Sequence, residues 1–134
     1  MKYFSLGELT FSPTATRRGI ENRPDYVQRA ALEALVHNIL DPLREAYGRP
    51  IVVNSGFRCK KLNSIVGGAA ASQHCKGEAA DIRTLENTRE GNYRLFQLIQ
   101  KLNLPFDQLI DEHNYAWVHV SFSSRHRRQI LHIK

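Results

Sequence analysis

Residues 106–122 read FDQLIDEHNYAWVHVSF, which is the pattern of two strands joined by a tight turn. We expect strands at 106–112 and 117–122, with 113–116 as the turn of an antiparallel hairpin. Side chains alternate between the two faces of a strand. In the second strand the apolar face consists of Val118, Val120 and Phe122. His119 therefore points to the opposite side, away from the core.

Helical patterns occupy much of the remaining chain. Residues 25–47 repeat apolar side chains at helical spacing, and Pro42 inside this run predicts a kink or a break. A short helix is expected at 60–66 and a second amphipathic helix at 90–102. We expect the buried side of that second helix to consist of Tyr93, Phe96, Leu98 or Ile99, and Leu102. Residues 1–24 are rich in turn formers and predict an irregular segment with one short helix.

The order of these elements favours the α+β class. Short β-branched or apolar runs predict further strands at 50–54 and 79–82, and a possible edge strand at 129–133. The last strands follow one another without helices between them, so we expect a small, mostly antiparallel sheet packed against helices. A length of 134 residues predicts one domain, spanning 1–134.

The charge of the chain narrows its possible partners. The net charge of +6 favours anionic partners such as nucleic acid, membrane surfaces or cell-wall polymers. No nucleic-acid motif is present and no segment is apolar enough to span a membrane, so neither partner is expected. The basic run 125–128 is interpreted as a solvated turn before the last strand. Residues 1–10 lack a signal-peptide pattern, which predicts synthesis in the cytoplasm without a signal peptide.

A second segment supplies side chains that could meet His119. Residues 72–81 read SQHCKGEAAD, and if Ala80 faces the core then Asp81 points the same way as His119. His74 lies in the loop before this strand. Two imidazoles and one carboxylate with an open fourth position are the minimum set for a catalytic zinc ion.

The two cysteines, Cys59 and Cys75, do not form a C-x-x-C pair. In a reducing cytosol we expect free thiols, with a disulfide or zinc ligation as alternatives.

These segments together resemble peptidase family M15, the zinc D-Ala-D-Ala carboxypeptidase group, and in particular its subgroup M15A. The resemblance is carried by S-x-H-x-x-G-x-A-A-D at 72–81 and W-V-H at 117–119, and it extends to V-N-S-G-F-R at 53–58 and F-D-Q-L-I at 106–110. It covers nearly the whole chain. The implied fold is that of the hedgehog and D-Ala-D-Ala peptidase domains.

The resemblance implies a role for each candidate residue. His74, Asp81 and His119 would bind one Zn²⁺, and a zinc-bound hydroxide would attack the peptide carbonyl. Glu112 is the candidate general base. It lies seven residues before His119, not at the short E-x-x-H spacing, so Asp111 and His113 remain rivals.

Other residues would contact the substrate. Arg58 would stabilise the oxyanion or bind a substrate carboxylate, a role that suits a planar guanidinium. Ser72 and Gln73 would bind the substrate from the loop that carries His74, which we call the zinc loop. Trp117 is either a wall of the cleft or a packing residue.

The implied function is hydrolysis of peptide bonds in peptidoglycan stem peptides or cross-links, by a carboxypeptidase or endopeptidase of phage endolysin type. The chain would be a monomer that acts on the cell wall after holin-type release or as part of a phage particle. The alternative is a zinc-stabilised, non-catalytic module of a phage particle that binds the wall or serves a structural role. A basic nucleic-acid binder is a third hypothesis.

Overall fold

The computed structural model describes residues 1–134 and contains one five-stranded sheet. The strands are β1 (Ile51–Ser55), β2 (Ala79–Thr84), β3 (Gln108–Glu112), β4 (Trp117–Ser121) and β5 (Gln129–Ile133). Their order across the sheet is β1-β2-β4-β3-β5. All neighbours are antiparallel except β3 and β5, which pair in parallel at one edge. The predicted α+β class with a mostly antiparallel sheet is therefore confirmed.

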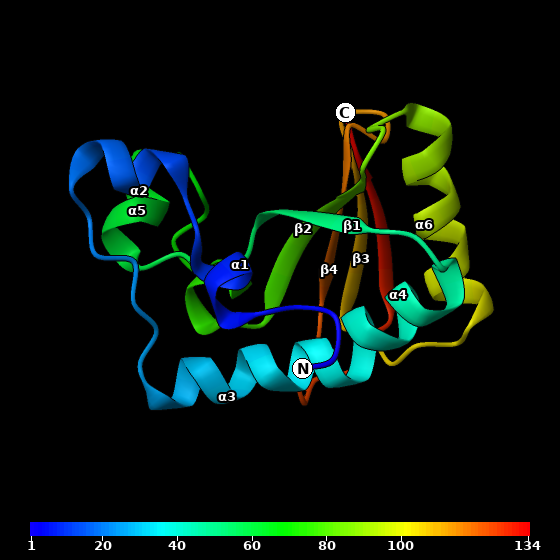
Figure 1. The fold of residues 1–134 in the computed structure, drawn as a ribbon, viewed down its shortest axis with the longest axis horizontal. Coiled ribbons are helices and arrows are strands. Elements are labelled where there is room, and N and C mark those ends of the chain that lie inside the picture. The colour runs from blue at the N-terminus through cyan, green and yellow to red at the C-terminus, as the bar shows by residue number, and fades with distance from the viewer.

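Helices lie on both sides of this sheet in Figure 1. The α-helices are α1 (Leu6–Thr10), α2 (Pro13–Arg18), α3 (Tyr26–Leu35), α4 (Asp41–Tyr47), α5 (Lys60–Ile65) and α6 (Arg89–Lys101). A π-helical turn, η1 (Val36–Leu40), joins α3 to α4, and a 3₁₀ turn, η2 (Gln73–Lys76), precedes β2. In Figure 1 the sheet stands between α6 and the part of the chain that carries α2 and α5. None of the helices combines the length and the apolarity needed to cross a membrane.

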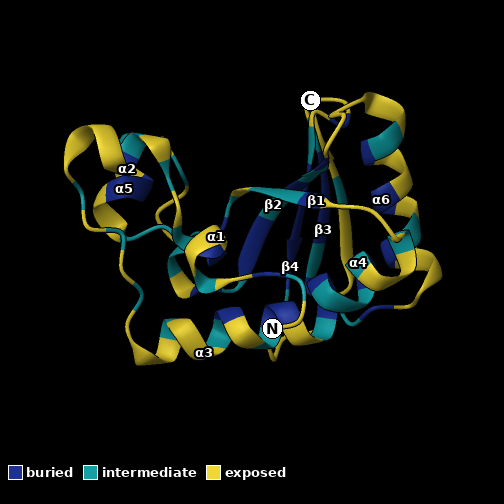
Figure 2. Cartoon of the chain, viewed as in Figure 1, coloured by how far each residue is buried: buried dark blue, intermediate teal, exposed yellow.

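The core lies between the sheet and its covering helices. It is a cluster of 21 buried apolar residues, and Figure 2 shows the burial concentrated in the central strands and on the inner side of α6. Val118 and Val120 of β4 and Ala80 and Ile82 of β2 are fully buried, as the alternation predicts. The opposite face of these strands is therefore free to carry polar side chains.

Helix α6 buries only part of the face that was predicted. Its buried residues are Asn92, Leu95, Phe96 and Ile99, whereas Tyr93 and Leu102 are more than one third exposed. The prediction is confirmed for Phe96 and Ile99 and is wrong for Tyr93 and Leu102, because the polar Asn92 faces the core in their place. Its amide accepts from the backbone N–H of Thr84 and donates to the carbonyl of Tyr115. These bonds offset the cost of burying the amide and tie α6 to the sheet.

The N-terminal segment is more regular than predicted. Residues Ser12 and Pro13 begin helix α2 instead of forming a turn: the hydroxyl of Ser12 accepts from the N–H of Ala15, and Pro13 occupies the first turn, where no N–H is needed. Gly19 ends the helix with a φ of 64°. The same residue types serve turns and helix caps, so composition alone did not separate the two.

The expected irregularity at Pro42 is a π-helical turn and not a break. The N–H of Asp41 bonds to the carbonyl of Val36, five residues earlier, directly before the proline. Such a wider turn accommodates a residue that cannot donate and whose ring would clash with the preceding turn. Helix α4 then ends at Gly48, which takes the left-handed conformation.

Candidate metal centre

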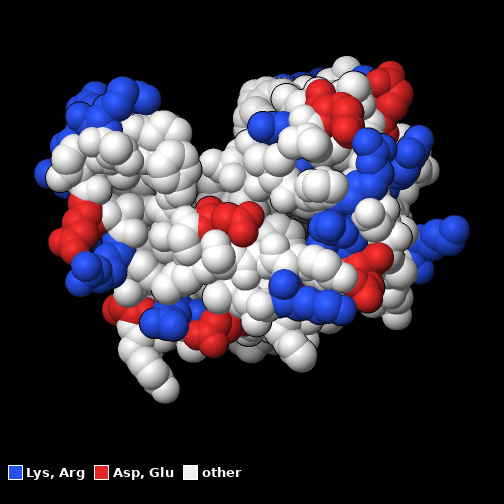
Figure 3. All heavy atoms as spheres, viewed as in Figure 1, with Lys and Arg blue, Asp and Glu red and all other residues white.

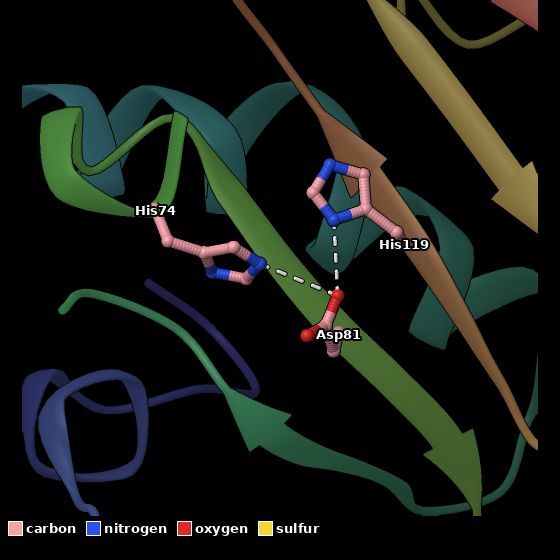
Figure 4. Close-up of side chains that lie close together, drawn as sticks. All are labelled: His74, Asp81 and His119. Atoms are coloured by element: carbon pink, nitrogen blue, oxygen red, sulfur yellow. Dashed lines mark hydrogen bonds and ion pairs between the residues drawn. The ribbon is translucent and has the colours of Figure 1, made fainter. Parts of the chain in front are cut away.

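Three side chains converge on the face of the sheet opposite the core. Asp81 on β2 lies directly across from His119 on β4, and its Oδ1 is 3.0 Å from His119 Nδ1. His74 Nε2 approaches the same oxygen at 3.3 Å. One potential ligand atom from each residue lies within 4.8 Å of the others, and Figure 4 shows both imidazoles turned toward the carboxylate. The structure thus brings together the three residues singled out from the sequence.

His74 is held in place by backbone contacts. The hydroxyl of Ser72 accepts from the His74 N–H, which fixes the start of η2. Gly77 ends this turn with a φ of 73°, and a Cβ there would lie 2.3 Å from the carbonyl oxygen of Gln28. Only glycine fits this close approach without strain. The turn therefore delivers the His74 ring to the start of β2 in one orientation.

The hydrogen-bond pattern of the three residues suits a bound cation. His74 Nδ1 lies 2.7 Å from the carbonyl oxygen of Gly56, which can only accept, so Nδ1 carries the hydrogen. In the neutral ring the lone pair of Nε2 then faces the carboxylate of Asp81, and two acceptors need a positive charge between them. Metal-bound histidines commonly donate their other N–H to a carbonyl in this way. The donor set fits a metal ion.

The carboxylate is charged in this environment. Burial alone would raise the pKa of Asp81, but the adjacent imidazoles of His119 and His74 outweigh it and hold the pKa well below its usual range. The side chains of His74, Asp81 and His119 are only 3%, 13% and 11% exposed. Two nitrogens and one anionic oxygen in a nearly dry site form the ligand set typical of a catalytic zinc ion.

A cavity of about 630 Å³ lies over this site. Its walls include every residue predicted for the site: Arg58, Ser72, Gln73, His74, Asp81, Glu112, Trp117 and His119. The lining comes both from the sheet and from the chain that follows α5. Figure 3 shows a hollow between the part carrying α2 and α5 and the part carrying the sheet.

The rivals of Glu112 occupy different surroundings. Asp111 does not line the cavity; it accepts from the N–H of Tyr115 at 2.6 Å and from His132 at 3.1 Å, which stabilises the hairpin turn. His113 does line the cavity and packs against Trp117 with ring centroids 5.1 Å apart. The carboxylate of Glu112 lines the cavity and makes no ion pair or hydrogen bond with the rest of the chain.

The hairpin brings Glu112 closer to His119 than the sequence spacing suggests. Ile110 pairs directly with His119, so Glu112, two residues further along β3, is its diagonal neighbour on the same face. Diagonal neighbours lie about 7–8 Å apart, and their Cβ atoms somewhat closer, so a glutamate side chain can reach over a metal ion from this position. The tight turn at 113–116 thus shortens a seven-residue separation to two positions along the sheet.

Several polar atoms of the cavity lack partners. Arg58 Nε, Trp117 Nε1 and Gln73 Oε1 are buried without a hydrogen bond. Buried polar groups are normally paired, so a cluster of unpaired ones in a cavity suits the binding of a polar ligand. Trp117 is accordingly a wall of the cavity.

Both Cys59 and Cys75 are free thiols, and burial raises the pKa of Cys75.

The basic run 125–128 after β4 forms ion pairs with a buried carboxylate, which the sequence did not suggest. It forms a turn before β5, as predicted, but the expectation of simple solvation is wrong. Arg127 Nε and Nη2 both donate at 2.9 Å to Asp107, whose side chain is fully buried, and Arg125 Nη2 lies 3.4 Å from the same carboxylate. Gln73 Nε2 donates to it as well. The hydrogen bond from Arg127 holds the pKa of Asp107 well below its usual range, despite burial.

Arg125 and Arg127 also line the cavity, and sequence reasoning missed both. The available signal was Asp107, an acid between Phe106 and the start of a buried strand, which requires cationic partners.

Comparison with known proteins identifies the class of this arrangement. The model of the Peptidase M15 family matches residues 2–121. The chain belongs to the Peptidase M15 family. A segment of 44 residues, 32% of the chain, is 52% identical to the zinc D-Ala-D-Ala carboxypeptidase of Streptomyces albus G. That match spans only 17% of the length of this relative.

Proposed function

We propose that this protein is a zinc metallopeptidase that hydrolyses peptide bonds in peptidoglycan stem peptides or cross-links. The observation that carries the proposal is the grouping of His74, Asp81 and His119 at the base of a cavity that also holds Glu112 and Arg58. Membership of a peptidase family supports the reaction class. The similarity to a zinc D-Ala-D-Ala carboxypeptidase supports the metal and the substrate class.

His74, Asp81 and His119 would hold the zinc ion through two nitrogens and one oxygen. When bound, zinc supplies a Lewis acid that polarises a carbonyl and lowers the pKa of a bound water to about 7. Glu112 takes a proton from the attacking water and delivers it to the leaving amine. Water is thus added across the C–N bond, which yields a carboxylate and an amine.

Arg58 stabilises the negative charge that develops on the carbonyl oxygen. Its side chain lines the cavity without an acidic partner, and its backbone N–H donates to the carbonyl of His74. This contact ties the arginine to the zinc loop. A guanidinium fixed before the reaction begins stabilises an oxyanion without reorganisation.

The polar walls would hold the peptide in place. Gln73 and Ser72 lie on the same loop as His74, and Trp117 presents an aromatic surface across the cavity. The hydroxyl of Ser72 already accepts from the His74 N–H, so it is oriented. We propose that residues 1–134 form one peptidase domain that acts on the cell wall as a monomer.

The test separates the enzyme from a zinc-stabilised binding or structural module. Glu112→Ala should lower the hydrolysis of purified peptidoglycan by about 10²–10⁴-fold, the usual contribution of a general base. Zinc content should stay near one ion per chain, because Glu112 is not among the three ligands. Glu45→Gln, in the exposed pair with Lys2, is the matched control and should keep full activity.

Two results would redirect the assignment. Full activity of Glu112→Ala would assign the base to His113 instead, because His113 is the remaining titratable side chain of the hairpin in the cavity besides the metal-site residue His119. If the wild-type protein binds zinc but releases no new amino termini from peptidoglycan, the non-catalytic module is correct.

A further inference from the structure

The second feature of the cavity is a pair of arginines, Arg125 and Arg127, which we call the basic rim. Both stand over the single buried carboxylate of Asp107. The carboxylates of Asp107 and of nearby Glu78 both act on Arg127, whereas Arg125 contacts Asp107 alone, at 3.4 Å. Asp107 is fully buried, so it anchors the rim from below and is not itself available to a ligand.

The two arginines have different amounts of free binding capacity. Arg127 uses Nε and Nη2 in a bidentate contact with Asp107. The Arg125 side chain lies 3.4 Å from Asp107 at its closest, makes no hydrogen bond and is 49% exposed. A guanidinium has five N–H donors in a fork that matches a carboxylate. The guanidinium of Arg125 therefore keeps N–H donors that a ligand in the cavity could accept from.

The acidic residues of the cavity do not neutralise this rim. Asp81 belongs to the candidate metal site, and Glu112 lies at the opposite end of β3. Four residues of strand separate Glu112 from Gln108, which is about 13 Å at roughly 3.3 Å per residue. The cavity thus has an acidic end at Glu112 and a basic end at the rim, with the three metal-site residues between them.

Gln73 links the basic end to the metal site. The side chain of Gln73 is buried, with the residue only 7% exposed, and its Nε2 donates to both Asp107 and Glu78. Two carboxylates fix the amide orientation, so the unpaired Oε1 cannot be an inverted nitrogen. A carbonyl held in this way suits the N–H of a peptide, beside a rim that suits a carboxylate.

The basic rim lies outside the part of the chain that matches the family model, which ends at residue 121. The family match therefore says nothing about what the rim binds. Its position is set by Asp107, which stands three residues before Ile110, the partner of His119. That separation is about 10 Å, the length of roughly three residues of extended peptide.

We propose that Arg125, supported by Arg127, binds a carboxylate of the peptide substrate within about three residues of the bond that is cut. This makes the protein selective for acidic peptides over the same peptides with amidated carboxylates. The inference rests on the proposed function for the statement that the cavity receives a peptide. Stem peptides offer two sources of the carboxylate, the D-Glu residue and the C-terminus, and the experiment distinguishes them.

The experiment uses the pentapeptide L-Ala-D-Glu-L-Lys-D-Ala-D-Ala in three forms: unmodified, amidated at D-Glu, and amidated at the C-terminus. Binding is measured by titration calorimetry on the zinc-free protein, and hydrolysis is measured separately with zinc. One amidated form should bind about 5- to 10-fold more weakly than the unmodified peptide, as expected for one partly exposed charge-assisted contact. The weaker form identifies the carboxylate.

Variants assign the preference to the rim. Arg125→Gln should reduce the preference to less than 2-fold, and Arg125→Glu should reverse it. Arg18→Gln removes the same charge from α2, outside the cavity, and should leave the preference intact. Arg125 is half exposed, so thermal unfolding should show that its variants remain folded.

The outcomes for the rim and for the enzyme are separable. A preference that depends on Arg125, without hydrolysis of the peptides or of purified peptidoglycan, supports the rim and overturns the peptidase. Hydrolysis with equal affinity for all three peptides supports the peptidase and overturns the rim. A preference that survives both Arg125 variants also overturns the rim.

Discussion

Replacing Asp107 with asparagine should destabilise the fold, because this carboxylate joins the basic rim to the zinc loop. The side chain is fully buried and accepts three hydrogen bonds at 2.9 Å from Arg127, counting its backbone N–H, and one from Gln73. Asn has nearly the same shape, so Asp107→Asn creates no cavity. It replaces one acceptor oxygen with an NH₂ group that faces the donors Arg127 Nη2 and Gln73 Nε2.

The cost follows from the two lost contacts. A hydrogen bond to a buried charge contributes about 1.5–3 kcal/mol, and partial exposure of the arginines reduces this to about 1–2 kcal/mol each. The expected loss is about 2–4 kcal/mol. For 134 residues the entropy of unfolding is about 0.28 kcal/mol/K, so the melting temperature should fall by about 7–14 °C.

The assay is thermal unfolding of both proteins as a function of pH. The folded-state pKa of Asp107 lies below its unfolded value of about 3.9, so its contribution is fully present above that pH and is lost as the pH falls below it. The difference between wild type and Asp107→Asn should be constant from about pH 5 to 8 and shrink below about pH 4.

The matched control for this prediction is Glu86→Gln, which breaks the exposed pair with Arg49 and should change stability by less than about 0.5 kcal/mol. Equal melting temperatures for Asp107→Asn and wild type at pH 7 would refute this account of the rim.

Three further changes test the metal site and its surroundings. Gly77→Ala should lower the free energy of unfolding by about 2–4 kcal/mol, since its φ is positive and its Cβ would meet the Gln28 carbonyl; Gly19→Ala, with a positive φ in open space, should cost only about 1 kcal/mol in the same thermal melts. Zinc at 100 times its dissociation constant should raise the wild-type melting temperature by about 10 °C, from a stabilisation of about 2.7 kcal/mol, whereas Asp81→Asn should show no such rise in scanning calorimetry. Arg58→Lys should reduce kcat/KM in a peptide-hydrolysis assay by about 10²–10³-fold, because a lysine cannot reproduce the planar fork; an unchanged value would remove Arg58 from oxyanion stabilisation.

The predictions that depend on strand alternation agreed with the structure. Asp81 and His119 were assigned to one side because their neighbours Ala80, Val118 and Val120 are apolar, and the register places the two directly opposite each other. Alternation is a local property of the backbone, so a single sequence displays it. The closeness of Glu112 to His119 depends on the pairing of β3 with β4, and their separation along the sequence does not reveal that pairing.

The predictions that failed depended on long-range contacts. Asn92 faces the core because its amide pairs with backbone groups of Thr84 and Tyr115, which lie 8 and 23 positions away in the sequence. Arg127 is anchored by Asp107, 20 positions earlier. A polar residue far from its partner looks like a surface residue until the fold is known. The role of the basic run therefore could not be predicted from its composition.

The most direct test of the central claim is mass spectrometry of purified peptidoglycan after digestion with the zinc-loaded protein, with and without a chelator. The account predicts new fragments that differ from the undigested material by cleavage of one peptide bond, and their disappearance when the chelator is present. It also predicts that Glu112→Ala, still carrying zinc, produces almost none of them. Zinc-loaded, folded protein that yields no new fragments would contradict the claim that this site is a peptidase.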